Sequence, residues 1–314
     1  MEKQRTLKDD IEILGIEPYG GNRVSLKISP ASENRGIIFY NAAHGAVRAN
    51  LAAAQAYKSS ITLRNDTMSV LNVEHILATL YSYGIDNAMI QVARQPNKSF
   101  AFLEYLHLAT AMQVLPYFTE REKTLCERID EVGVEAQQMP RRMLRLKEDI
   151  ITDKLSLEKT DTPGLIVRAT TSYPLLGEST IELQITPEAY KSELSRARPY
   201  AKHAPAWMPR KITRFFACLL NPSFGLSHGF DEDNVLVPER SREKLLEEQR
   251  RVGYDKGDEI TRHTIVDRLG SLALLPGRLD HVRVTARFSG HANDLDVLRK
   301  NLDKLSTSST GFSS

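Results

Sequence analysis

Several short segments of the chain alternate apolar and polar residues, which is the pattern of a β-strand with one buried face. Thr180–Ile185 shows it most clearly, because every second residue there is isoleucine or leucine. Gly36–Tyr40 is apolar almost throughout and is expected to be a more deeply buried strand. The other segments predicted to be strands are Val24–Ile28, Ile85–Val92 and Val282–Phe288.

Two further segments have apolar residues at intervals of three and four, the spacing of one face of an α-helix. The first predicted helix runs from Val73 to the helix-ending residue Gly84, and the second lies within Gly257–Leu275. Each is expected to pack its apolar face into a core. The positions that define these faces are Val73, Ile76, Leu77 and Leu80 in the first helix, and Ile265, Leu269 and Leu272 in the second.

Polar residues predict the starts of two more helices. Thr119–Glu122 matches a capping box, so a helix is expected from there to about Asp130. Thr186–Glu188 combines a capping hydroxyl, a proline at the first helical position and an acid in the first turn. Pro199–Pro209, with three prolines, is expected to be an irregular loop.

The order of these elements predicts an α+β fold in two domains of similar topology, each with helices layered against a β-sheet. A chain of 314 residues is long enough for two cores. The N-terminal domain is expected at residues 1–130 and the C-terminal domain at residues 143–305. Residues 131–142 are predicted to be a linker, and the Ser- and Thr-rich tail, residues 306–314, is predicted to be disordered.

Composition narrows the class of protein. Hydrophobic residues make up 41% and charged residues 26%, which is typical of a globular protein, and a net charge of +2 gives no reason to expect nucleic acid as a partner. The chain has no signal-peptide pattern and no apolar run long enough for a transmembrane helix. Cys126 and Cys218 lack the spacing of a disulfide framework or a thiolate zinc site. A cytoplasmic enzyme or binding protein is therefore expected, with no indication of its oligomeric state.

The candidate chemistry centres on the predicted helix in the C-terminal half. Residues four apart share one face of a helix, so His263 and Asp267 present an imidazole and a carboxylate to the same point, with Ser271 one turn further along. Such ligands suit zinc or a similar divalent ion, which needs a third protein ligand. The same spacing also occurs in surface pairs that bind no metal, and that interpretation competes with the first.

Two other histidines stand beside residues that fit a catalytic site. Glu74 precedes His75 at the start of the first predicted helix, and His291 follows Ser289 and Gly290 directly after a predicted strand. Taken alone, each histidine is equally compatible with a structural or exposed position.

Together with their surroundings, these residues resemble the UDP-3-O-acyl-N-acetylglucosamine deacetylases, the LpxC family, which are zinc amidases of lipid A biosynthesis. The matching landmarks occur in the same order along nearly the whole chain. They are Gln4–Lys8, Gly15, Gly21, Pro30–Gly36, Val73–Ala78, Gly84–Asn87, Ser195–Arg198, Asp233–Val237, Arg262–Asp267 and Ser289–His291.

The resemblance implies an active site between the two domains that uses Zn²⁺ as cofactor. It implies that His75, His263 and Asp267 are the zinc ligands. Glu74 is then the general base that takes a proton from water, and His291 the charged group that stabilises the oxyanion and protonates the leaving amine. The expected products are a free amine and acetate.

The chain departs from the family pattern in the residues expected to hold the substrate. Thr264 replaces a lysine, Ser271 replaces the aspartate that supports the catalytic histidine, and Pro199 replaces a threonine that assists the oxyanion. Tyr19 replaces a histidine of the glycine-flanked N-terminal motif, and residues 96–100 replace an Asp-Gly-Ser-Ala segment. The candidate substrate-binding residues are Thr264, Ser271, Tyr19 and Arg198.

These observations predict a zinc-dependent amide hydrolase that removes an acetyl group from a small N-acetylated amino sugar, nucleotide-linked or acylated. Two alternatives follow from the departures. One is an LpxC-like paralogue with a different N-acetyl substrate, and the other is a weakly active protein that retains the metal and serves as a binding or regulatory module.

Overall fold

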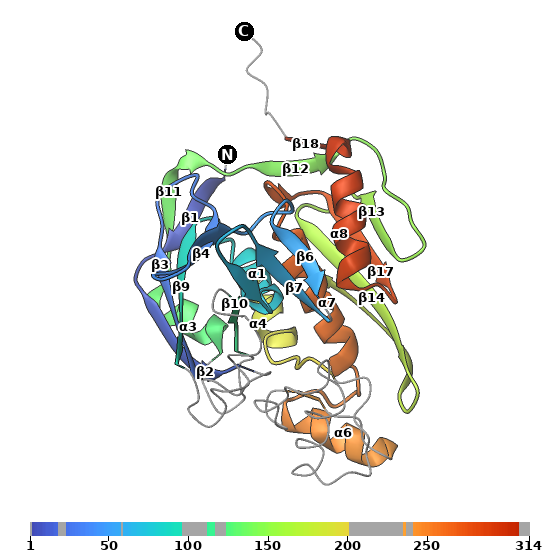
Figure 1. Cartoon of the computed structure of the whole chain (residues 1–314). Coiled ribbons are helices and arrows are strands. Elements are labelled where there is room, and N and C mark those ends of the chain that lie inside the picture. Colours follow the sequence, from blue (N-terminus) through green and yellow to red (C-terminus); the bar gives the residue numbers. More distant parts are fainter. Residues whose placement is uncertain are drawn as a thin grey trace.

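The structure is a computed structural model, and it describes residues 2–17, 23–57, 59–95, 112–116, 124–200, 235–236 and 241–307. Within these ranges, six α-helices and several β-sheets form the α+β fold that the sequence predicts (Figure 1). None of the helices in this part of the chain is long and apolar enough to span a membrane.

The first half of the chain forms two sheets and a two-stranded ribbon. Its strands are β1 (Lys3–Leu7), β2 (Ile11–Ile16), β3 (Arg23–Pro30), β4 (Ile37–Asn41), β5 (Gly45–Arg48), β6 (Ala54–Tyr57), β7 (Ser60–Arg64), β8 (Ser69–Leu71), β9 (Ala88–Gln95), β10 (Met112–Val114) and β11 (Val134–Pro140). The larger sheet has the order β2-β3-β9-β4-β5 and is antiparallel except between β4 and β9. The second sheet has the order β10-β8-β7-β6, and β1 pairs with β11.

The second half forms two more sheets. Its strands are β12 (Met143–Leu146), β13 (Leu155–Lys159), β14 (Leu165–Tyr173), β15 (Gly177–Gln184), β16 (Arg278–Leu279), β17 (Val282–Arg287) and β18 (Leu305–Thr307). The main sheet has the order β13-β17-β14-β15, in which β14 and β17 are parallel, and the smaller sheet has the order β16-β12-β18. Among the described strands, none pairs across residues 141–142. The proposed division into two domains fits this arrangement, although its exact boundaries remain a prediction.

Two helices, one from each half, meet in the middle of the molecule. The helices are α1 (Glu74–Ser82), α3 (Leu125–Val132), α4 (Pro187–Glu193), α6 (Arg242–Arg251), α7 (Glu259–Leu272) and α8 (His291–Lys300), followed by the short 3-10 helix η2 (Leu302–Lys304). Figure 1 shows α1 and α7 between the sheets of the two halves. α7 also packs against β14, while α8 packs against α7 and β6.

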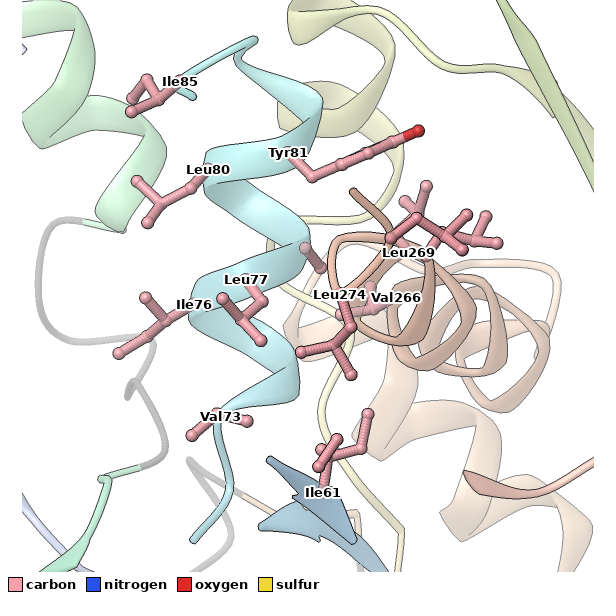
Figure 2. Close-up of a cluster of buried hydrophobic side chains, with 14 of the residues drawn as sticks. Ile61, Val73, Ile76, Leu77, Leu80, Tyr81, Ile85, Val266, Leu269 and Leu274 are labelled. Carbon is pink, nitrogen blue, oxygen red and sulfur yellow. The ribbon is translucent and has the colours of Figure 1, made fainter. Parts of the chain in front are cut away.

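The contact between α1 and α7 is made by buried aliphatic side chains (Figure 2). Leu77 of α1 and Leu269 of α7 are both 0% exposed, and Val266 and Leu274 are almost as deeply buried. They belong to one apolar cluster that includes residues of both halves. Burying a side chain of this size contributes about 1.5–3 kcal/mol. The apolar faces predicted for these two helices therefore fix where their polar residues meet.

Gly270 allows the two helices to approach closely. A Cβ atom at this position of α7 would lie 2.6 Å from the carbonyl oxygen of Glu74 and 2.7 Å from its Cα atom. Atoms do not approach so closely without displacement, so any side chain at position 270 would push the start of α1 away from α7. The absence of that side chain brings Glu74 and His75 against the polar face of α7.

Most elements predicted from hydrophobic patterning are present. The predicted strands at Val24–Ile28, Gly36–Tyr40 and Val282–Phe288 correspond to β3, β4 and β17, and the strand at Thr180–Ile185 corresponds to β15. The first predicted helix is α1, and Gly84 follows it with a φ of +71°, a conformation that favours glycine. Thr186 caps α4 by accepting a hydrogen bond from the backbone of Ala189, with Pro187 as the first helical residue.

The predicted strand Ile85–Val92 begins too early in the sequence. The strand β9 starts at Ala88, because the preceding residues are held by other contacts. The side-chain amide of Asn87 donates to Gln4 and Gln137 and accepts from the backbone of Gly36. Asp86 forms an ion pair with Arg141. The sequence pattern that predicted the strand therefore begins in the loop of residues 85–87, before the backbone pairing of β9 starts at Ala88.

Most of the predicted linker, residues 131–142, is regular secondary structure, and its role in joining two domains stays a prediction. α3 ends at Val132, and Val134–Pro140 is strand β11, whose backbone pairs with β1. Gln137, which suggested an exposed linker, donates its side-chain amide to the carbonyl of Ala31. Polar side chains are compatible with this strand, because the side chain of Gln137 binds the neighbouring loops at Ala31 and Asn87.

The predicted disordered tail, residues 306–314, also begins too early. Ser306 and Thr307 belong to β18, where they pair with Arg145 and Leu144 of β12. Residues 308–314 lie outside the described residues. The backbone of β18 forms the edge strand of the sheet β16-β12-β18, and the Ser- and Thr-rich composition alone does not reveal this pairing.

The capping box that starts α3 lies further along the chain than Thr119–Glu122, which is outside the described residues. α3 begins at Leu125. Thr124 accepts a hydrogen bond from the backbone of Glu127, and Glu127 accepts one from the backbone of Thr124.

Candidate metal centre

The first turn of α1 places a carboxylate and an imidazole at the contact with α7. Glu74 is the first residue of the helix, and its side chain is buried. The backbone N–H of Ile61 on β7 donates to Glu74 Oε2 over 2.9 Å. Burial and the neighbouring carboxylate of Asp267 raise the pKa of Glu74 to about 8. The metal-free protein therefore holds a proton on this group at neutral pH.

The facing side of α7 supplies a second imidazole and another carboxylate. His263 and Asp267 lie one turn apart, with His263 Nδ1 3.5 Å from Asp267 Oδ2. Across the helix contact, His263 Nε2 lies 3.2 Å from His75 Nε2. His75, His263 and Asp267 each offer one ligand atom, and these atoms lie within 4.8 Å of one another. The structure thus brings together the three residues that the sequence predicts as metal ligands.

The chemistry of this cluster fits a divalent cation. His263 Nδ1 and Asp267 Oδ1 are buried and have no hydrogen-bond partner in the described part of the chain. Burial, with a contribution from the charge of Arg268, lowers the pKa of His263 to about 3, so its imidazole is neutral at pH 7. Neutral imidazoles and a carboxylate are ligands that Zn²⁺ prefers. A bound cation would satisfy buried polar atoms that otherwise destabilise the fold.

Acidification is expected to destabilise the metal-free protein partly through His263. Between pH values of about 3 and 6.5, the unfolded chain binds a proton at this residue that the folded chain excludes. The stability provided by the neutral imidazole is therefore complete above pH 6.5 and is lost as the pH falls, by about 1.4 kcal/mol per pH unit.

Urea unfolding of the metal-free wild type and of His263→Gln, from about pH 4 to about pH 7, measures this effect. The free energy of unfolding is expected to fall less steeply with acidification in the variant. Parallel curves for the two proteins would mean that the folded state admits the proton at His263.

His291 approaches the same cluster from α8, of which it is the first residue. Its Nε2 lies 3.7 Å from Asp267 Oδ1, and the side chain is buried. Burial lowers the pKa of His291 to about 4 in the metal-free protein. Both ring nitrogens lack a hydrogen-bond partner among the described residues. The imidazole is therefore neutral here at pH 7 and could take up a proton only when negative charge develops beside it.

Three of the predicted substrate-binding residues have their polar groups engaged by the protein itself. Thr264 donates its hydroxyl to the carbonyl of Ile260 over 2.9 Å, and Ser271 donates to the carbonyl of Asp267 over 3.2 Å. The guanidinium of Arg198 is buried and pairs with Glu259, the first residue of α7. These contacts favour structural roles within and around α7. Tyr19, the fourth predicted residue, lies outside the described residues.

Replacing Ser271 with alanine is therefore expected to leave the kcat of the predicted hydrolase within about threefold of wild type, because the hydroxyl donates to the carbonyl of Asp267 in its own helix. Steady-state kinetics with the zinc-loaded protein measure this. A loss of about 100-fold in kcat would instead show that the hydroxyl rotates toward substrate during the predicted reaction.

Two residues near the cluster were not predicted from the sequence. The ring of Tyr200 stands edge-on to His263, with ring centroids 6.0 Å apart. Arg268, directly after Asp267, is almost fully buried. Arg268 could have been recognised from the sequence, because it directly follows the predicted metal ligand Asp267. No spacing pattern in the sequence points to Tyr200.

The family model for LpxC, UDP-3-O-acyl N-acetylglycosamine deacetylase, matches residues 4–303. A UDP-3-O-acyl-N-acetylglucosamine deacetylase of Sulfurimonas denitrificans is 26% identical over 280 residues, which cover 87% of this chain and 82% of the relative. Proteins of the same name from Aliarcobacter butzleri and Oleidesulfovibrio alaskensis are 24% and 26% identical, covering 93% and 94% of this chain and 88% of each relative. Because the family model spans nearly the whole chain, this protein belongs to the UDP-3-O-acyl N-acetylglycosamine deacetylase family.

Proposed function

We propose that this protein is a zinc-dependent deacetylase that hydrolyses the acetamide of a UDP-3-O-acyl-N-acetylglucosamine, giving a free amine and acetate. The observation that carries the proposal is the convergence of His75, His263 and Asp267 beside the buried carboxylate of Glu74. The names of the relatives support the substrate class.

In this proposal, His75, His263 and Asp267 hold the zinc ion. When bound, Zn²⁺ supplies Lewis acidity that lowers the pKa of water and polarises a carbonyl group. Two imidazoles and a carboxylate are the protein ligands of several catalytic zinc sites. Because they come from α1 and α7, the apolar contact between these helices sets the distances among them.

Glu74 is proposed to act as the general base. Its Oε2 accepts the backbone N–H of Ile61, which fixes the orientation of the carboxyl group and leaves Oε1 to exchange a proton. The raised pKa of about 8 places Glu74 near the operating pH, where a general base is most effective. A cation held by the neighbouring ligands favours the ionised form of this carboxyl group.

His291 is proposed to stabilise negative charge on the substrate and to give a proton to the leaving amine. It starts as a neutral imidazole, since burial lowers its pKa to about 4. Negative charge developing on the substrate carbonyl oxygen favours the imidazolium, so His291 takes up a proton from solvent as the charge forms and gives it to the amine. Glu74 returns to solvent the proton that it took from water, so the products are the free amine and acetate.

Acetate release by the zinc-loaded protein tests this function. The substrates are UDP-3-O-acyl-N-acetylglucosamine, UDP-N-acetylglucosamine and oligomers of N-acetylglucosamine. Release is expected from the acylated nucleotide sugar, with loss after treatment with a chelator and recovery after zinc is restored. If only another member of the panel is hydrolysed, the substrate assignment is wrong, and if none is hydrolysed the deacetylase proposal fails.

A second candidate function is a metal-retaining module that binds a sugar nucleotide but turns it over slowly. The observation in its favour is that Thr264 and Ser271 bond to their own helix while Pro199 has no N–H to donate. Calorimetric binding of UDP-N-acetylglucosamine without acetate release from any substrate would favour this function over the first.

A further inference from the structure

Arg268 connects the metal-ligand face of α7 to the beginning of α8. It is the residue after Asp267, and only 2% of its side chain is exposed. Its Nε lies 2.5 Å from Oδ2 of Asp294, which is equally buried. Its Nη1 donates to the carbonyl of Ser289 over 3.0 Å, and its Nη2 lies 4.0 Å from Asp267 Oδ2. One guanidinium therefore reaches a candidate metal ligand and two points on the chain around His291.

The two points that Arg268 holds stand on either side of His291. Ser289 lies two residues before it and Asp294 three residues after it. The ends of this segment are also joined to each other, because Ser289 donates its hydroxyl to Asp294 Oδ1 and accepts a hydrogen bond from the amide of Asn293. The segment is thus a closed turn fastened to α7 by a buried ion pair.

Among the described residues, no hydrogen bond to the imidazole ring fixes the orientation of His291. Both of its nitrogens lack hydrogen-bond partners in the described residues, although the side chain is buried. The hydroxyl of Ser271, on the neighbouring face of α7, is engaged with the carbonyl of Asp267. The position of the imidazole, 3.7 Å from Asp267, is therefore set by the backbone turn that carries it.

We infer that Arg268 and Asp294 are positioning residues for His291, acting through the turn between Ser289 and Asp294. The inference rests on the proposed role of His291 in deacetylation. Burying an ion pair is costly unless its geometry is well matched, and apolar residues of similar volume often stabilise a fold equally well. The pair here spans the short distance between a metal-ligand helix and the turn that bears the proton-transferring histidine, where a displacement of about 1 Å can cost about 100-fold in rate.

A double variant separates positioning from stability. Arg268→Met with Asp294→Leu removes both charges and fills the space with apolar atoms, so the fold is expected to be retained. The matched control is Asp296→Leu with Lys300→Met, which removes an exposed ion pair further along α8. Asp294→Asn keeps the volume of the side chain and serves as a second variant if the double variant does not fold.

With folding confirmed by circular dichroism, the double variant is expected to lose about 100-fold in kcat with KM unchanged, while the control keeps wild-type kinetics. Zinc affinity, measured by competition with a chelating dye, is expected to change by less than about tenfold, because all three ligands remain. Wild-type kcat in the folded double variant, or in Asp294→Asn if that variant replaces it, would overturn the inference.

Nuclear magnetic resonance of the metal-free protein gives a readout that does not depend on activity. The ring signals of His291, assigned by their absence from His291→Gln, are expected as one sharp set in the wild type and in the control. In the double variant they are expected to broaden or divide, because the turn is no longer fastened to α7. If wild-type protein shows no turnover, the proposed function fails, whereas unchanged His291 signals in the double variant contradict the positioning role itself.

Discussion

Replacing Glu74 with glutamine is expected to lower kcat by about 1000-fold while leaving zinc bound. Glutamine has the same shape, and its carbonyl oxygen can accept the backbone N–H of Ile61 as Oε2 does in the wild type. The variant loses only the ability to take and return a proton. Steady-state kinetics on the acylated nucleotide sugar, together with zinc analysis of the same preparation, measure both expectations.

The unfolding temperature of the metal-free Glu74→Gln variant shows whether the substitution affects the fold as well as the proton transfer by Glu74. Because burial raises the pKa of Glu74 to about 8, the wild-type carboxyl group is protonated in the metal-free protein at pH 7, and a neutral amide should fit equally well. The unfolding temperature without metal is therefore expected to change little. A kcat within tenfold of wild type would remove Glu74 from the mechanism and assign the proton transfer to another group.

Replacing Gly270 with alanine is expected to weaken both the fold and the metal centre. The new methyl group would overlap the backbone of Glu74, with its Cβ 2.6 Å from the carbonyl oxygen, and backbone atoms cannot move aside as a flexible side chain can. Overpacking of this kind costs about 1–3 kcal/mol. Because His75 moves with α1, zinc affinity is expected to fall by at least about tenfold.

Urea unfolding of the metal-free protein and zinc competition with a chelating dye measure these two losses. Ser271→Ala is the matched control, since it alters the next residue of α7 without adding bulk. Wild-type stability and zinc affinity in Gly270→Ala would show that α1 and α7 do not approach as closely in solution.

Local patterning was sufficient to predict the two helices, α1 and α7, that carry the candidate metal ligands. The apolar spacing of Ile265, Leu269 and Leu272 identified α7, and with it the shared face of His263 and Asp267. The sequence could not show by spacing alone that α1 lies against α7. That contact depends on Gly270 and on apolar side chains more than 190 residues apart, for example Leu77 and Leu269. The resemblance to a family supplied the grouping of the ligands before the structure showed their proximity.

The sequence predictions failed where backbone pairing or a distant partner overrides composition. Gln137 and Ser306 suggested a linker and a tail, yet both lie in strands whose partners, β1 and β12, are far away in the sequence. Thr264 and Ser271 were predicted to contact substrate from their place in the family pattern. Each donates its hydroxyl to a carbonyl one turn earlier in α7, and their contact with substrate stays a prediction. Helical position alone does not reveal which way such a hydroxyl is turned.

Diffraction from zinc-soaked crystals at the zinc absorption edge tests the central claim most directly. One anomalous peak per chain is expected, in contact with His75, His263 and Asp267, and it should be absent from crystals of His263→Ala. A peak bound by other residues, or no peak in wild-type crystals at saturating zinc, would contradict the assignment of these three residues as the metal centre.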